Sequence, residues 1–86
     1  MPRISSFYGI VIAMYYREHG VPHFHARYGE HEASISIVSL EVLGGFLPAR
    51  ALRLVRHWGD LHREELRINW DRAQREEVLE NIDPLL

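Results

Sequence analysis

The chain has 86 residues and a formal net charge of −2, with 47% hydrophobic and 26% charged residues. This length allows a single small domain, and we expect residues 1–86 to form it around one modest core. The composition is typical of an ordinary globular protein and excludes a disordered tail. The slightly negative net charge also gives the whole protein no field that would attract nucleic acid.

No segment indicates a membrane or secreted protein. The longest apolar stretch, Tyr8 to Tyr16, contains Gly9 and stops at Arg17, so it is too short to span a bilayer. Residues 1–6 lack the layout of a secretory signal. The absence of cysteine excludes disulfides and thiolate metal sites. We therefore expect a cytoplasmic protein without a membrane partner.

The first third of the chain predicts one long strand. Residues Tyr8 to Arg17 are rich in β-branched and aromatic side chains and apolar on both faces, which is typical of a central, covered strand. Tyr8, Tyr15 and Tyr16 belong to this strand, and at least one of them should be exposed if the sheet has an open face. Residues 3–6 precede the strand in a terminus that we expect to be mobile or docked on a partner.

Two alternating segments then predict a β-hairpin. After a turn at Glu18 to Pro22, polar and apolar residues alternate in His23 to Tyr28 and again in Glu32 to Val38. The intervening Gly29-Glu30 fits a two-residue type II′ turn, which sets a register with like residues opposite each other. The predicted pairs are Arg27 with Glu32, Ala26 with Ala33, His25 with Ser34, Phe24 with Ile35 and His23 with Ser36.

This hairpin carries the most informative pattern in the chain. The nine residues from His19 to Arg27 hold three of the six histidines. Because alternate side chains of a strand share a face, His23, His25 and Arg27 line one side of it. Folding does not require two imidazoles and a guanidinium in a row. These three residues are therefore the main candidates for catalysis or for contact with a target, and Glu32 opposite Arg27 is a further binding candidate.

The second half of the chain predicts helices. Leu40 to Leu43 is a candidate edge strand that Gly44-Gly45 would end, and Leu47-Pro48 opens a helix. Gly59-Asp60 is expected to end that helix and cap a second one. The apolar stripe of the first helix consists of Leu47, Ala51, Leu54, Trp58 and Leu61, and that of the second of Leu66, Trp70 and Ala73. Residues 81–86 are apolar enough to pack back on the domain or dock on a partner.

All ten basic residues are arginine. Codon usage in a GC-rich genome explains this simply, although arginine also suits phosphate or carboxylate partners. Arg50, Arg53 and Arg56 repeat along the first helix, where like charges repel and a phosphate or acidic partner would relieve the repulsion. A solvated helix face, neutralised by nearby acidic residues, is the favoured alternative. Arg53 and Arg56 are kept as candidate contacts.

These elements predict an α+β domain, in which a small antiparallel β-meander of three to four strands is followed by two C-terminal α-helices packed on one face. Phosphate-binding glycine loops, nucleophile elbows and dinucleotide fingerprints are missing from the sequence. A hydrolase with a nucleophile triad is therefore not expected. Whether the protein is an enzyme stays open. The small core makes association into a homo-oligomer or a hetero-oligomer plausible.

Over nearly its whole length the chain resembles the small bacterial family known as domain of unknown function 4160. Its Pro22-His23-Phe24-His25 box is the most distinctive match. The other matching pieces are Met1-Pro2, Ile4-Ser5, Phe7, Gly9-Ile10, Tyr28-Gly29-Glu30, Leu47-Pro48, Trp58, Glu65-Leu66, Asn69-Trp70 and Ile82-x-Pro84-Leu85. Because the resemblance covers the N-terminus, Arg3 and Ser5 join Tyr8 as candidate contact residues.

The resemblance implies a biological context. Members of this family look like the toxin half of bacterial type II toxin–antitoxin modules, and the neighbouring gene often encodes a protein of the domain-of-unknown-function 2442 type, the presumed antitoxin. Some such toxins are thought to block translation. We therefore expect a toxin that impairs translation at the ribosome or on RNA and is neutralised by a protein antitoxin.

Three interpretations of His23 and His25 remain open. With His19, His31 or Glu32 they would ligate Zn²⁺ or another divalent ion, although no cofactor is the default expectation. With Arg27 they would act as acid and base in a small endoribonuclease. In the third interpretation they are hydrated residues bonded to Ser34 and Ser36, in a non-catalytic adaptor module.

Overall fold

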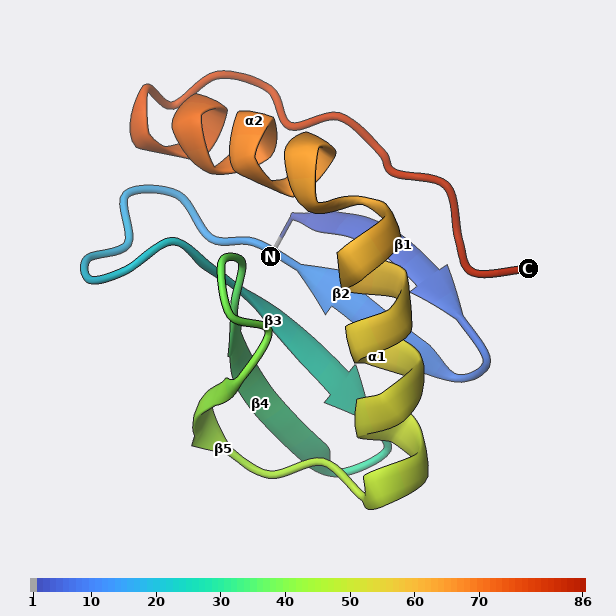
Figure 1. The fold of residues 1–86 in the computed structure, drawn as a ribbon. Coiled ribbons are helices and arrows are strands. Elements are labelled where there is room, and N and C mark those ends of the chain that lie inside the picture. The colour runs from blue at the N-terminus through green and yellow to red at the C-terminus, as the bar shows by residue number, and fades with distance from the viewer. Residues whose placement is uncertain (1) are drawn as a thin grey trace.

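The computed structural model describes residues 2–86, which form an antiparallel sheet and two helices (Figure 1). The elements are β1 (Arg3–Phe7), β2 (Ile10–Ala13), β3 (His23–Tyr28), β4 (His31–Ser36), β5 (Val42–Gly45), α1 (Ala49–Leu61) and α2 (Arg63–Gln74). The five strands form a meander in the order β1-β2-β3-β4-β5. The predicted α+β class is confirmed, with one strand more than expected. None of the helices in residues 2–86 has the length and apolar character needed to cross a membrane.

The strand predicted at Tyr8 to Arg17 is much shorter than expected: within this range only Ile10–Ala13 forms a strand, β2, which is covered and lies inside the sheet as predicted. The chain reverses at Tyr8-Gly9, where both residues have positive φ (50° and 80°), so that β1 pairs with β2. Two consecutive positive φ values match the twist of a tight hairpin. Tyr8 directly precedes the apolar residues of β2 with only Gly9 between them, which is why the reversal was not recognised in the sequence. Strand β2 ends at Ala13, and residues 14–22 form a loop.

The extra strand, β1, also brings the N-terminal residues into the sheet. Arg3 and Ser5 lie in β1, an edge strand, instead of in a mobile or partner-docked segment. Ile4 of the same strand is 1% exposed and belongs to the core. Of the three tyrosines assigned to the long strand, Tyr8 lies in the turn, and Tyr15 and Tyr16 lie in the loop after β2.

The β3–β4 hairpin has the predicted register. All five predicted pairs are present, from Arg27 opposite Glu32 to His23 opposite Ser36. Gly29 has a φ of +60°, as the first position of the predicted turn requires. Strand β4 starts at His31 and ends at Ser36, two residues before the predicted end.

Helix α1 packs against one face of the sheet and builds the core. Trp58 is fully buried, and its ring meets Phe24 of β3 and Phe7 of β1 at centroid distances of 5.9 and 5.4 Å. Leu66, Trp70 and Ala73 of α2 are buried as predicted. The core therefore takes apolar side chains from the sheet and from both helices.

The boundary between the helices differs from the prediction. Helix α1 continues through Gly59 and Asp60 to Leu61, and His62 lies between the two helices. Gly59 is buried, and a Cβ there would lie 2.9 Å from Leu40 Cδ2. The glycine therefore serves close packing and not a helix cap. Leu61 is also 59% exposed, so the predicted apolar stripe ends one turn earlier.

Strand β5 includes the two glycines that were expected to end it. It runs over Val42–Gly45, and Gly45 pairs with Ala33 of β4. A Cβ on Gly45 would lie 2.2 Å from the backbone oxygen of Glu32. The glycine is needed because the two backbones approach closely at this point.

The C-terminal segment packs back on the domain. Ile82 is 4% exposed, and its amide donates a hydrogen bond of 2.8 Å to the carbonyl oxygen of Ile4. The side chain of Leu85 is partly buried against the core, while Leu86 is fully exposed. Of the two predicted alternatives for residues 81–86, the structure has the intramolecular one.

Candidate functional site

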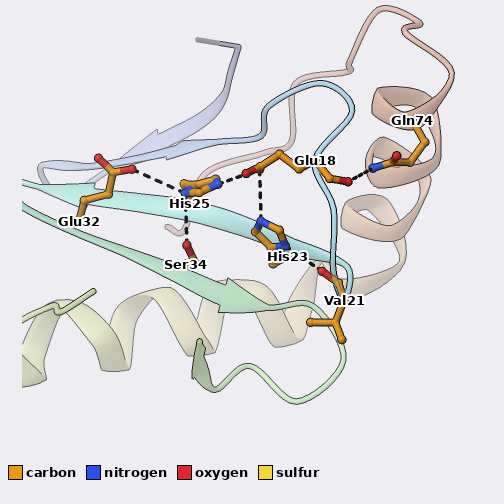
Figure 2. Close-up of polar contacts among 7 residues, drawn as sticks. All are labelled: Glu18, Val21, His23, His25, Glu32, Ser34 and Gln74. Atoms are coloured by element: carbon orange, nitrogen blue, oxygen red, sulfur yellow. Dashed lines mark hydrogen bonds and ion pairs between the residues drawn. The ribbon is translucent and has the colours of Figure 1, made fainter. Parts of the chain in front are cut away.

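The sheet face opposite α1, the outer face, carries the predicted histidine row. Figure 2 shows His25 and Glu32 along the upper part of the β3–β4 hairpin, with α1 below the strands. His25 and Arg27 alternate with the core residues Phe24 and Ala26, so the strand places them on the outer face. Arg27 lies opposite Glu32 and beside Val11 in the sheet register.

Three side chains converge at one end of this face and form the histidine cluster, which consists of Glu18, His23 and His25 (Figure 2). The Nε2 atom of His25 lies 2.8 Å from Glu18 Oε1, and the Nε2 atom of His23 lies 3.2 Å from the same oxygen. The side chains of His23 and His25 are 10% and 14% exposed, and that of Glu18 is 26% exposed. The cluster is therefore sheltered but reachable from solvent.

The ring of His23 is fixed by its surroundings. Its Nδ1 donates a hydrogen bond of 2.7 Å to the backbone oxygen of Val21. The ring packs against Trp70 of α2 at a centroid distance of 5.1 Å and against His25 at 5.3 Å. Ser36 lies opposite in the register, but its hydroxyl accepts a hydrogen bond from the amide of Ser39. Ser36 was the expected hydrogen-bond partner of His23, but the contacts of the ring nitrogens are with Val21 and Glu18 instead.

The ring of His25 lies between two carboxylates. Its Nδ1 is 3.4 Å from the hydroxyl of Ser34, as the predicted register implies, and 3.6 Å from Glu32 Oε2. Tyr15 covers the ring edge-on at a centroid distance of 4.4 Å. Burial raises the pKa of Tyr15, the negative charge of Glu32 adds to the rise, and Arg27 opposes it. A neutral tyrosine therefore covers the cluster at physiological pH.

The loop that carries Glu18 is attached to α2. The side-chain amide of Gln74 donates a hydrogen bond of 3.1 Å to the backbone oxygen of Glu18 (Figure 2). The adjacent amide of Arg17 donates to the carbonyl oxygen of Ala73 at 3.3 Å, and its guanidinium forms an ion pair with Glu76. These contacts position the carboxylate of Glu18 above the histidines.

A second feature of the same face is a depression of about 440 Å³, the Arg3–Arg27 depression. Its described lining consists of Arg3, Gly9, Val11, Arg27 and Gly29, and none of these residues is acidic. Val11 and Arg27 are also neighbours of His25 and Glu32 in the sheet, because Arg27 lies between Val11 and Glu32 in the register and two residues from His25. The depression and the histidine cluster therefore share one surface.

The other predicted site residues lie apart from the cluster. Ser5 is 8% exposed within β1, and Tyr8 is 59% exposed in the β1–β2 turn. Arg53 and Arg56 are exposed on α1, the helix on the opposite side of the sheet. Asp60, expected to neutralise the arginines of that helix, forms its ion pair with Arg63 at 3.1 Å.

Glu18 is the member of the cluster that the sequence prediction missed. His19, His31 and Glu32 were the expected third ligands, but His19 is exposed and the ring of His31 packs on Phe46. Only Glu18 joins His23 and His25 within ligand distance among residues 2–86. The sequence did contain a signal for this role, since Glu18 is an acidic residue in the predicted turn directly before the strand that carries the histidines.

Comparison with known protein families gives a match. A family model described as "Domain of unknown function (DUF4160)" matches residues 9–71, which include the histidine cluster and most of both helices. Searches of curated proteins and of solved structures found no match.

Proposed function

This chain belongs to the DUF4160 family, and from that premise we propose that it is the toxin half of a bacterial toxin–antitoxin module that impairs translation by contacting RNA, free or within the ribosome. In this proposal it acts in the cytoplasm and is neutralised by a protein antitoxin of the domain-of-unknown-function 2442 type. Family membership supports the toxin–antitoxin context, because that context was inferred from the resemblance to this same family.

The observation that supports RNA contact is the Arg3–Arg27 depression. The arginine residues Arg3 and Arg27 line it from two different strands, in a chain whose net charge is −2. Guanidinium groups bind phosphate through paired, charge-assisted hydrogen bonds. The depression also lies on the face that α1 leaves uncovered, so that a backbone phosphate can approach it.

A role in RNA cleavage is the second candidate, because His25 lies on the same face between two carboxylates. A histidine between carboxylates has partners for both ring nitrogens and can exchange a proton with a reacting hydroxyl. Cleavage would leave new RNA ends, whereas a stoichiometric block of translation would leave RNA intact. Sequencing of RNA ends after induction separates the two modes of action.

The test is the rate of labelled amino-acid incorporation within minutes of inducing the chain in a bacterial host. We expect a rapid fall with the natural chain and a much smaller fall with the double variant Arg3→Gln/Arg27→Gln. The matched control is Arg53→Gln/Arg56→Gln, which removes the same charge from α1 and should retain the full effect. Normal incorporation with well-expressed, folded natural chain would overturn the toxin proposal. Equal effects of the two double variants would overturn the assignment of the depression.

A further inference from the structure

Both imidazoles of the histidine cluster place a ring nitrogen close to the same carboxylate oxygen, Glu18 Oε1. The backbone oxygen of Val21 can only accept a hydrogen bond, so His23 Nδ1, 2.7 Å away, carries the hydrogen. In a neutral imidazole the Nε2 atom then holds a lone pair. This Nε2 atom lies 3.2 Å from Glu18 Oε1. An imidazole nitrogen and a carboxylate oxygen are both ligand atoms for divalent transition metals.

His25 allows the same arrangement. Its Nδ1 lies 3.4 Å from the hydroxyl of Ser34, which can accept a hydrogen from it or donate one to it, and 3.6 Å from Glu32 Oε2. When Nδ1 carries the hydrogen, Nε2 holds a lone pair directed at Glu18 Oε1, at 2.8 Å. In this arrangement each imidazole has one nitrogen held by an outer acceptor and the other turned toward the shared carboxylate (Figure 2). Metal-binding histidines in proteins are oriented in this way.

We propose that Glu18, His23 and His25 bind one divalent transition-metal ion, with Zn²⁺ as the ion that best fits these ligands. The site goes beyond the proposed function and does not depend on it. One ligand atom from each of the three residues lies within 4.8 Å of the other two. In a tetrahedral zinc site with bonds near 2.0 Å, ligand atoms lie about 3.3 Å apart. Glu18 Oε1 lies 3.2 Å from His23 Nε2, close to that value, and 2.8 Å from His25 Nε2, so that this pair would have to separate by about half an ångström to admit the ion.

The type of ligand selects the class of metal. Two imidazoles and one carboxylate suit zinc and other first-row transition metals, whereas Mg²⁺ prefers oxygen ligands and octahedral geometry. Three protein ligands leave one position of a tetrahedral ion open to water, as in catalytic zinc sites. Glu18 is the most exposed of the three side chains, so that position would face solvent.

The ligands are already held in place without the ion. His23 is packed between Trp70 and His25, and Tyr15 covers His25. Glu18 is attached to α2 through Gln74. Binding would therefore cost little ordering of side chains, which favours affinity. The ion would also connect the loop of residues 14–22 to strand β3.

The direct test uses the purified full-length chain after removal of metals with a chelator. Titration with Zn²⁺ in an isothermal calorimeter should give one ion per chain, and Mg²⁺ at the same concentrations should give no heat of binding. His25→Ala should weaken Zn²⁺ binding by at least about tenfold, in the range seen when metal sites lose a supporting group. The control His31→Ala removes a histidine outside the cluster and should leave the affinity unchanged. No Zn²⁺ binding by the natural chain, or equal affinities of the two variants, would overturn the proposal.

A second measurement needs no variant and so does not depend on whether His25→Ala folds. In long-range ¹H–¹⁵N spectra of the natural chain, one equivalent of Zn²⁺ should shift the Nε2 resonances of His23 and His25. The resonances of His19, His31, His57 and His62 should stay in place. A cluster held together only by a proton would show no such selective shift, and that result would also contradict the metal site.

Discussion

The indole Nε1 of Trp58 donates a hydrogen bond of 2.8 Å to the backbone oxygen of Asp83. Trp58 lies in α1 and is fully buried, while Asp83 lies in the C-terminal segment, which has no helix or strand. The buried side chain of Trp58 therefore also holds the C-terminal segment against the domain. Ile82, the neighbour of Asp83, is held at the same time by the backbone of β1.

Trp58→Phe keeps an aromatic ring in the core but removes this donor. We expect the free energy of unfolding to fall by about 1–2 kcal/mol, from the lost hydrogen bond and the smaller ring. The amide of Ile82 should exchange faster with solvent because the C-terminal segment loosens. Urea denaturation and hydrogen exchange measure the two effects. Trp70→Phe is the control, since it should leave exchange at Ile82 unchanged, and equal exchange in both variants would contradict the role of Trp58.

Asn69 joins α2 to the segment that follows it. The side chain is 1% exposed, donates to the backbone oxygen of Glu80 at 2.8 Å and accepts from the Glu80 amide at 2.9 Å. Asn69→Leu removes both hydrogen bonds and should lower the free energy of unfolding by roughly 1–3 kcal/mol in urea denaturation.

Asn69→Asp makes a sharper test of the same contact. At neutral pH it places a carboxylate against the backbone oxygen of Glu80, so it should destabilise the fold more than Asn69→Leu does. A protonated carboxyl can donate to that oxygen. The difference in free energy of unfolding between Asn69→Asp and the natural chain should therefore become smaller as the pH falls and the carboxyl group becomes protonated. If the loss of stability in Asn69→Asp did not depend on pH, the contact with the Glu80 backbone oxygen would not be the reason that position 69 requires an amide.

Gly45 and Gly44 form a matched pair in β5. Gly45 has a φ of +82° and would place a Cβ 2.2 Å from the backbone oxygen of Glu32, whereas a Cβ on Gly44 would meet nothing within 4 Å. Gly45→Ala should therefore destabilise the protein by roughly 1–3 kcal/mol through backbone strain. Gly44→Ala should have little effect. Urea denaturation of the two variants checks the difference, and equal stabilities would refute the close approach of β4 and β5.

Glu77 should contribute a small stabilisation that depends on pH. Hydrogen bonds from the Arg75 guanidinium hold the pKa of the Glu77 carboxyl below its ordinary value. Because the pKa is lower in the folded state, the stabilisation is present above the ordinary carboxyl pKa and is lost as the pH falls through the lowered one. Glu77→Gln should thus be less stable than the natural chain at neutral pH and equally stable in strong acid. Denaturation curves at several pH values test this, and a larger difference in acid would contradict the sign.

Much of the fold was predictable where the signals are local. The β3–β4 register followed from alternation of polar and apolar residues on both sides of Gly29-Glu30, and every predicted pair is present. The burial of Trp58 and Trp70 followed from helical spacing. The turn at Tyr8-Gly9 was missed because Tyr8 adjoins the apolar residues of β2 and was assigned to the same strand. The helix boundary was misplaced because Gly59 serves a contact with Leu40, a residue distant in the sequence.

The common strand face of His23, His25 and Arg27 follows from the amino-acid sequence alone, because side-chain direction alternates along any extended backbone. The groups that contact the two imidazoles depend on the tertiary structure. Residues 14–22 have no periodic pattern, and their path depends on contacts with α2, more than fifty residues away along the chain. Those contacts bring Glu18 to the histidines and leave His19 in solvent, because a loop takes the position that its distant hydrogen bonds allow.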